Sequence, residues 1–195
     1  LCVDANPTLS LKEAKHWLRV LSDCDIRWLD EPFAPDNIRL FADLVQYKRN
    51  HSLSCEIVTG ENCPNYFTAA ALMNIGIDRF QVDPCRMLGL IDSVLVCIIA
   101  SISKCMITPH AGGSALDELS PHIQLFNLAR IATELSSSGS LTENVGFCSH
   151  HFAVPTTVKD GRAKTHNSSG LLVGLAETSL IQTRDYKEGT SWLKL

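Results

Sequence analysis

The sequence predicts an α/β domain built on a parallel β-sheet, because short apolar runs alternate with amphipathic stretches along most of its length. Six strand-then-helix units are expected, and the last of them, which includes residues 141–145, is less regular. Two architectures share this rhythm, an open doubly wound sheet and part of an eight-stranded barrel. Neither GxGxxG nor GxxxxGK[ST] occurs, so no motif supports a nucleotide-binding sheet.

Local patterns set the boundaries of the expected elements. A first helix begins at Ser10, because Ser10 and Glu13 can form a capping box ahead of residues with helical spacing. Asp36 is expected to cap the second helix. The other expected elements are strands at 1–3, 26–29, 57–58, 80–82 and 106–108 and helices at 66–75, 90–102 and 116–131.

After residue 153 the strand–helix rhythm stops. An Asp-Gly pair at 160–161 predicts a tight hairpin, and a tail of mixed composition follows it. We therefore expect two parts, the strand–helix units of residues 1–153 and a C-terminal segment with the hairpin and the tail over residues 154–195.

The composition is that of a globular protein. With 195 residues, 45% of them hydrophobic and 19% charged, a disordered or collagen-like chain is excluded. The net charge of −4 argues against a protein that binds nucleic acid or an anionic membrane. The eight cysteines form no CxxC pair, so we expect reduced thiols in an intracellular protein. The longest apolar stretch, residues 88–103, is shorter than the ~20 residues of a membrane span.

An ionisable residue follows each of the six expected strands. These residues are Asp4, Asp30, Glu61, Asp83, His110 and Glu143. Because all strands of a parallel α/β fold end on one face, we expect these side chains to converge on one rim. Helix caps alone would not explain the series, since caps use Ser, Thr and Asn as readily as acids.

The first three carboxylates predict a magnesium site. Asp4, Asp30 and Glu61 cannot all stay ionised at one place without a counter-charge, and ligands that are all oxygen suit Mg²⁺ better than zinc. Asp83 and His110 then form an acid–base pair, in which the carboxylate fixes the tautomer of the imidazole and raises its basicity. Such a pair suits removal of a proton alpha to a metal-bound carboxylate, or protonation of a leaving group.

Five motifs give the sequence a family resemblance. They are Val-Asp-Ala-Asn (3–6), Trp-Leu-Asp-Glu-Pro (28–32), Thr-Gly-Glu-Asn (59–62), Gln-Val-Asp-Pro-Cys-Arg (81–86) and Pro-His-Ala-Gly-Gly (109–113). In this order they resemble the mandelate-racemase subgroup of the enolase superfamily, and most closely the L-fuconate dehydratase-like proteins. The likeness covers roughly residues 1–175.

The resemblance implies a partial TIM-like (β/α) barrel, with its third to eighth strands in residues 1–153 and without the N-terminal capping domain and first strands. It implies a Mg²⁺-dependent hydro-lyase that abstracts the alpha proton of a metal-bound sugar acid. An enediolate forms, and loss of water gives a 2-keto-3-deoxy acid. The expected partner is a small sugar acid, with no nucleic acid and no membrane. The expected location is cytoplasmic or mitochondrial, and the full-length parent is expected to be a homo-oligomer.

Carried over by position, the family's roles fall on the residues already singled out. Asp4, Asp30 and Glu61 would bind Mg²⁺, Asp83 and His110 would form the catalytic dyad, and Glu143 would hydrogen-bond the substrate carboxylate. The sequence departs from the family's pattern at two points, at Asp30 and at a lysine motif.

The family usually has Glu where this chain has Asp30, and the neighbouring Glu31 should point the other way if the strand is regular. The family's Lys-x-Lys motif has no match here. Arg86 is expected to lie on the surface or to form a salt bridge, with contact to a substrate carboxylate as the alternative.

Other functions stay open beside this one. The substrate could be another sugar acid, such as L-galactonate or L-rhamnonate, or the enzyme could be a racemase of the same superfamily. Outside catalysis, the chain could be a truncated product or pseudoenzyme that keeps the rim without activity. Since the chain starts with Leu1 in what looks like mid-domain, we expect these 195 residues alone to be inactive and poorly folded.

Overall fold

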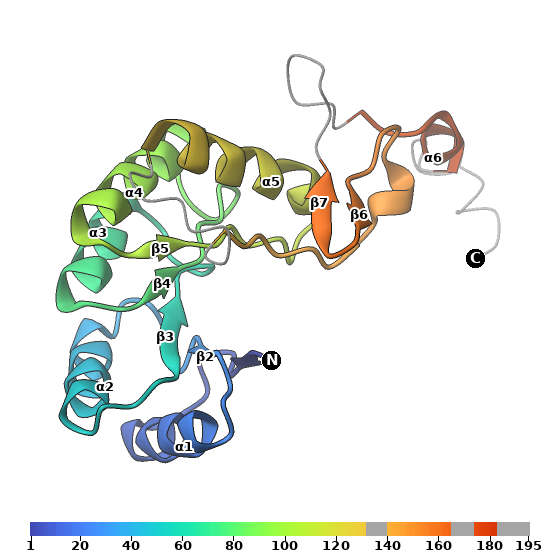
Figure 1. Ribbon diagram of the computed structural model, residues 1–195. Coiled ribbons are helices and arrows are strands. Elements are labelled where there is room, and N and C mark those ends of the chain that lie inside the picture. Colours follow the sequence, from blue (N-terminus) through green and yellow to red (C-terminus); the bar gives the residue numbers. More distant parts are fainter. Residues whose placement is uncertain (132–139, 165–173, 183–195) are drawn as a thin grey trace. The chain divides into compact units, whose positions relative to one another are not determined.

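A computed structural model describes residues 1–131, 140–164 and 174–182 of the chain (Figure 1). The chain divides into two compact units. The first unit comprises Leu1–Pro109 and Ile123–Leu141, and the second comprises His110–His122 and Thr142–Leu195. The partition expected from the sequence, at residue 153, stays a prediction.

The first unit is built on a five-stranded parallel sheet whose strands lie in sequence order. The strands are β1 (Val3–Asp4), β2 (Trp28–Asp30), β3 (Glu56–Thr59), β4 (Arg79–Phe80) and β5 (Met106–Ile107). The helices that follow the first four strands are α1 (Leu11–Asp23), α2 (Ile38–Asn50), α3 (Tyr66–Ile75) and α4 (Leu90–Ser103). Figure 1 shows α2, α3 and α4 on one side of the strands, as in the wall of a barrel, whereas a doubly wound sheet has helices on both faces.

The local signals explain most helix ends. The predicted capping box is confirmed, because Ser10 Oγ accepts a hydrogen bond from Glu13 N while Glu13 Oε2 accepts one from Ser10 N. The predicted cap at Asp36 is wrong. The N-cap of α2 is Asn37, because the Asp36 carbonyl accepts a hydrogen bond from Ile38 N in a tight turn, which moves the helix start one residue on.

The core of the first unit lies between the sheet and its helices. The side chains that fill it include Leu29, Ile57, Val58, Phe80, Leu44 and Leu72, all fully buried. One charged side chain is buried with them. Arg79 donates hydrogen bonds to the Glu56 carboxylate and to Thr108 Oγ1, and its guanidinium lies over the Trp28 ring. These partners let a charged group stay in the interior.

The second unit contains the start of α5 (Leu116–Phe126), the short 3₁₀ helix Ser149–His151, the hairpin strands β6 (Thr157–Lys159) and β7 (Arg162–Lys164), and α6 (Glu177–Gln182). The predicted hairpin is confirmed: β6 and β7 are antiparallel, and Asp160 and Gly161 both have positive φ, as a type I′ turn requires. A π-helical turn, Asn127–Ile131, continues from α5. Most of the expected tail lies outside the described residues.

The prediction of a sixth strand near residues 141–145 is wrong, because these residues form no strand in the described part of the chain. The backbone N–H groups of Val145 and Gly146 donate to the Asp117 carboxylate instead of to a neighbouring strand. No helix among the described residues has the length and apolar character needed to cross a membrane.

Candidate functional site

Carboxylates gather at the carboxyl ends of the first strands of the sheet. Asp4 ends β1 and Asp30 ends β2, and the two are register partners on neighbouring parallel strands, so their side chains lie on the same side of the sheet. Glu31 follows Asp30 directly, and Glu61 follows the end of β3. The Asp30 and Glu31 residues are only 4% and 1% exposed. Asp4, Asp30, Glu31 and Glu61 together form a carboxylate cluster.

The electrostatics of the cluster show how closely these acids interact. Burial raises the pKa of Asp30 to about 8, and the negative charges of Asp4, Glu31 and Glu61 add to this shift. Burial also raises the pKa of Glu31 to about 6, with the charge of Glu61 as the next cause, while hydrogen bonds from Asn62 act in the opposite direction. Both acids therefore resist ionisation unless a positive charge is nearby.

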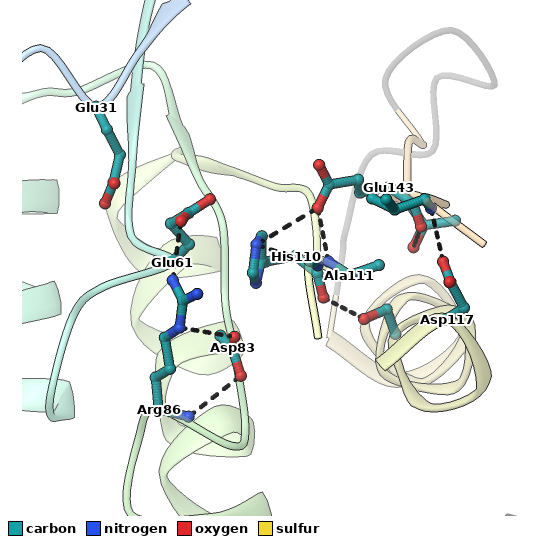
Figure 2. A network of polar contacts seen from close by, with 12 residues as sticks. Glu31, Glu61, Asp83, Arg86, His110, Ala111, Asp117 and Glu143 are labelled. Atoms are coloured by element: carbon teal, nitrogen blue, oxygen red, sulfur yellow. Dashed lines mark hydrogen bonds and ion pairs between the residues drawn. The ribbon is translucent and has the colours of Figure 1, made fainter. Parts of the chain in front are cut away.

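Glu31 takes part in this cluster because β2 ends one residue before it. Glu31 was expected to point away from Asp30 only if the strand continued regularly through it. The strand does not continue, because Glu31 has a φ of +39°, outside the strand region. Its carboxylate accepts hydrogen bonds from Asn62 Nδ2 at 2.6 Å and from Asn62 N at 3.4 Å. Figure 2 shows Glu31 directed toward Glu61. No sequence signal marked this departure, since a residue before proline is expected in the extended region at negative φ.

The residues of the cluster fit a hard divalent cation. The buried oxygen Asp30 Oδ1 has no hydrogen-bond partner among the described residues, although it belongs to a side chain surrounded by other carboxylates. An acceptor of this kind, in a donor set made only of oxygens, suits Mg²⁺. Within the described ranges, no group of three His, Cys, Asp or Glu side chains is already arranged around a single metal position.

Asp83 and Arg86 lie beside the cluster in the same unit. Asp83 Oδ1 accepts hydrogen bonds from Cys85 N at 2.7 Å and from Arg86 N at 3.2 Å, which fixes the turn after β4. The Arg86 side chain donates to Glu61 Oε1 at 2.8 Å, and its Nε lies 3.7 Å from Asp83 Oδ2 (Figure 2). The predicted salt bridge of Arg86 is therefore confirmed.

The second unit places His110 next to Glu143. His110 Nε2 lies 3.7 Å from Glu143 Oε2, and the same carboxylate oxygen accepts a hydrogen bond from Ala111 N at 2.7 Å (Figure 2). Gly112 N donates to His110 Nε2 at 3.1 Å, so the neutral ring carries its proton on Nδ1. Gly112 has no room for a side chain, because an added Cβ would collide with His110 Nε2.

Two residues at the start of α5 hold this pair, and the sequence reasoning did not find them. Ser120 Oγ donates to the carbonyl of His110. Asp117, which is 1% exposed, accepts hydrogen bonds from Val145 N at 2.8 Å and Gly146 N at 2.7 Å and so anchors the loop that carries Glu143. No sequence signal marked Asp117, since an acid in the first turn of a helix is ordinary.

The six predicted rim residues are thus divided between the two units. Asp4, Asp30, Glu61 and Asp83 belong to the first unit, and His110 and Glu143 belong to the second. The pairing of Asp83 with His110 joins residues of different units and stays a prediction.

Comparison with known proteins gives the chain a family. Residues 1–179 match the family described as enolase C-terminal domain-like. The chain is 28% identical over 196 residues to mitochondrial enolase superfamily member 1 of Bos taurus and 30% identical over 195 residues to L-galactonate dehydratase of Hypocrea jecorina. These alignments cover 100% and 98% of this chain but 43% and 42% of the relatives, so the chain spans less than half of their length.

Solved structures agree with this match. Human mitochondrial enolase superfamily member 1 superposes with a TM-score of 0.86 at 26% identity, over 98% of this chain and 42% of that one. The L-talarate dehydratase of Polaromonas sp. JS666, solved with Mg and L-glucarate, has a TM-score of 0.75 at 22% identity, over 95% of this chain and 47% of that one, and shows the fold alone. The predicted fold class, part of an enolase-superfamily barrel, is confirmed.

Proposed function

Since this chain belongs to the enolase C-terminal domain-like family, we propose that it supplies the metal-binding and proton-transferring half of a Mg²⁺-dependent hydro-lyase for a sugar acid. One observation carries the proposal: Asp30 has a buried carboxylate oxygen without a partner among the described residues, and Asp4, Glu31 and Glu61 surround it with negative charge. A divalent cation satisfies that oxygen and compensates that charge at once.

In the proposed site, Asp4, Asp30 and Glu61 hold Mg²⁺, and Glu31 adds a fourth carboxylate beside them. When bound, the metal withdraws electron density from the substrate carboxylate and so makes the neighbouring C–H more acidic. The shorter Asp30, in place of the usual Glu, reaches less far, and Glu31, whose carboxylate accepts a hydrogen bond from Asn62, is proposed as a further oxygen ligand.

The proton transfer falls to His110 in this proposal. Its Nε2 carries no proton in the neutral ring, and it can accept the alpha proton of the substrate once its lone pair is released from the hydrogen bond with Gly112 N. Asp83 is proposed to accept the Nδ1 proton in a hydrogen bond that orients the ring. Glu143, held by Ala111 N, is proposed to hydrogen-bond the substrate carboxylate. The proton taken up by His110 is proposed to pass to the neighbouring hydroxyl, which leaves as water, and the resulting enol tautomerises to the 2-keto-3-deoxy acid.

The substrate is proposed from the same class of sugar acids. The motifs favour L-fuconate, while the 30% identity to a relative named L-galactonate dehydratase makes L-galactonate the second candidate. We also propose an intracellular enzyme that acts as a homo-oligomer in its full-length form.

The test uses the 195-residue chain, alone and fused behind the part of the bovine relative that precedes the matched region. Each is incubated with Mg²⁺ and L-fuconate, L-galactonate or L-rhamnonate, and the keto acid product is trapped with semicarbazide and measured by absorbance. We expect turnover from the fusion and a loss of about 10²–10⁴-fold in its His110→Asn variant. Equal turnover by that variant, or Mg²⁺ binding without any turnover by the fusion, would contradict the proposal.

A further inference from the structure

Arg86 places a positive charge against the carboxylates of Glu61 and Asp83. Its Nη1 donates hydrogen bonds to Glu61 Oε1 and to Asn62 Oδ1, both at 2.8 Å, and its Nε lies 3.7 Å from Asp83 Oδ2 (Figure 2). All of these atoms belong to the first unit, on the turns that follow β3 and β4.

Asn62 extends this contact to the buried part of the carboxylate cluster. Its Nδ2 donates to Glu31 Oε2 at 2.6 Å and to Glu61 Oε1 at 3.3 Å, while its Oδ1 accepts from Arg86. The side-chain amide of Asn62 thus directs its oxygen toward the guanidinium of Arg86 and its nitrogen toward Glu31 and Glu61. Through Asn62, the guanidinium of Arg86 is linked to Glu31 as well as to Glu61.

We infer that Arg86 is an internal counter-ion, which compensates the Glu61 carboxylate while no metal is bound and competes with Mg²⁺ for it. This inference rests on the proposed function, because it takes the carboxylate cluster as the metal site. A guanidinium and a divalent cation repel each other, and an oxygen that accepts a short charged hydrogen bond is a poorer metal ligand. Arg86 therefore lowers the Mg²⁺ affinity and stabilises the metal-free fold.

The environment of Arg86 allows its side chain to move away when the metal arrives. The side chain is 40% exposed, whereas that of Asp83 is fully buried. The backbone of Arg86 stays fixed, because its N–H donates to Asp83 Oδ1. The guanidinium can therefore turn toward solvent without changing the turn after β4.

The experiment compares the full chain with Arg86→Gln and, as a control with the same change of charge, Arg39→Gln on the exposed face of α2. Mg²⁺ affinity is measured by titration calorimetry, and the melting temperature is measured in EDTA and in saturating Mg²⁺. For Arg86→Gln we expect about tenfold tighter binding, which is about 1.4 kcal/mol. We also expect a lower melting temperature in EDTA and a smaller difference from the unchanged chain in Mg²⁺. Arg39→Gln should behave like the unchanged chain.

These readouts separate competition from a merely structural role. If Arg86 only holds the two turns in place, its removal weakens Mg²⁺ binding together with stability. Unchanged or weaker binding by Arg86→Gln, while the unchanged chain binds Mg²⁺, would overturn the inference and leave the proposed function standing. An absence of Mg²⁺ binding in both would overturn the proposed function and this inference with it.

A second variant keeps the test decisive if Arg86→Gln does not fold in EDTA. Arg86→Lys retains the charge but donates from a single ammonium group in place of the planar fork. Its Mg²⁺ affinity is expected between that of the unchanged chain and the tenfold gain. Binding weaker than that of the unchanged chain would overturn the inference.

Discussion

Replacing Asp30 by asparagine is expected to stabilise the metal-free protein at pH 8 and to flatten the pH dependence of its stability. In the folded protein the pKa of Asp30 is raised from its ordinary 3.8 to about 8, mainly by burial and then by the charges of Asp4, Glu31 and Glu61. Between these two pH values the folded state keeps a proton that the unfolded state has released. The free energy of unfolding must therefore fall as the pH rises through this window.

The size of this effect follows from the width of the window. Each pH unit between the unfolded and folded pKa values changes stability by about 1.4 kcal/mol for one proton. For Asp30 this gives an upper bound of about 6 kcal/mol lost between pH 4 and pH 8. Below pH 4 both states are protonated, and above pH 8 both are ionised, so this contribution is constant outside the window. An asparagine has no proton to lose, and it removes this slope.

Urea unfolding in EDTA at pH 5, 6, 7 and 8 measures the slope. Asp36→Asn, an exposed acid ahead of α2, serves as the matched control and should keep the slope of the unchanged chain. The reasoning is refuted if the unchanged chain becomes more stable from pH 5 to pH 8, or if Asp30→Asn retains the full downward slope.

Three further predictions concern the same two clusters. Mg²⁺ affinity should rise between pH 6 and pH 8, because bound protons must leave Asp30 first; calorimetry in buffers of different ionisation enthalpy should detect their release, and a pH-independent affinity would contradict this. Gly112→Ala should lower turnover of the fused enzyme with little change in melting temperature, because the new Cβ displaces the His110 ring; normal turnover would show that the ring position is unimportant. Asp117→Ala should cost about 1–3 kcal/mol in urea unfolding, since it strips the buried N–H groups of the Glu143 loop of their acceptor, whereas a neutral effect would mean that the loop finds other partners.

The sequence predicted those features that depend on neighbours along the chain or on strand ends. The capping box at Ser10 is local, and it is present in the structure. Asp4 and Asp30 were predicted to converge because each ends a parallel strand, and they are register partners. The fold class followed from the same alternation of strands and helices.

The features that were missed depend on backbone geometry or on distant partners. Glu31 joins the cluster through a positive φ, which its residue type does not announce. The strand expected at residues 141–145 is absent because the carboxylate of Asp117, 28 residues before Val145, takes the N–H groups that a sheet would need. A pattern of apolar residues gives no information about such a long-range competitor.

The carboxylate cluster links stability, proton binding and metal binding through one excess of negative charge. Three kinds of positive charge can compensate it: protons on Asp30 and Glu31, the guanidinium of Arg86, and a divalent cation. Protons do so only at low pH, and Arg86 reaches Glu61 and Asp83 but makes no hydrogen bond that satisfies Asp30 Oδ1 among the described residues. A divalent cation can contact several of these oxygens at once, including the buried one. In the proposed site a divalent cation would therefore remove the most repulsion at neutral pH, because it would compensate a carboxylate that burial leaves without a hydrogen-bond partner among the described residues.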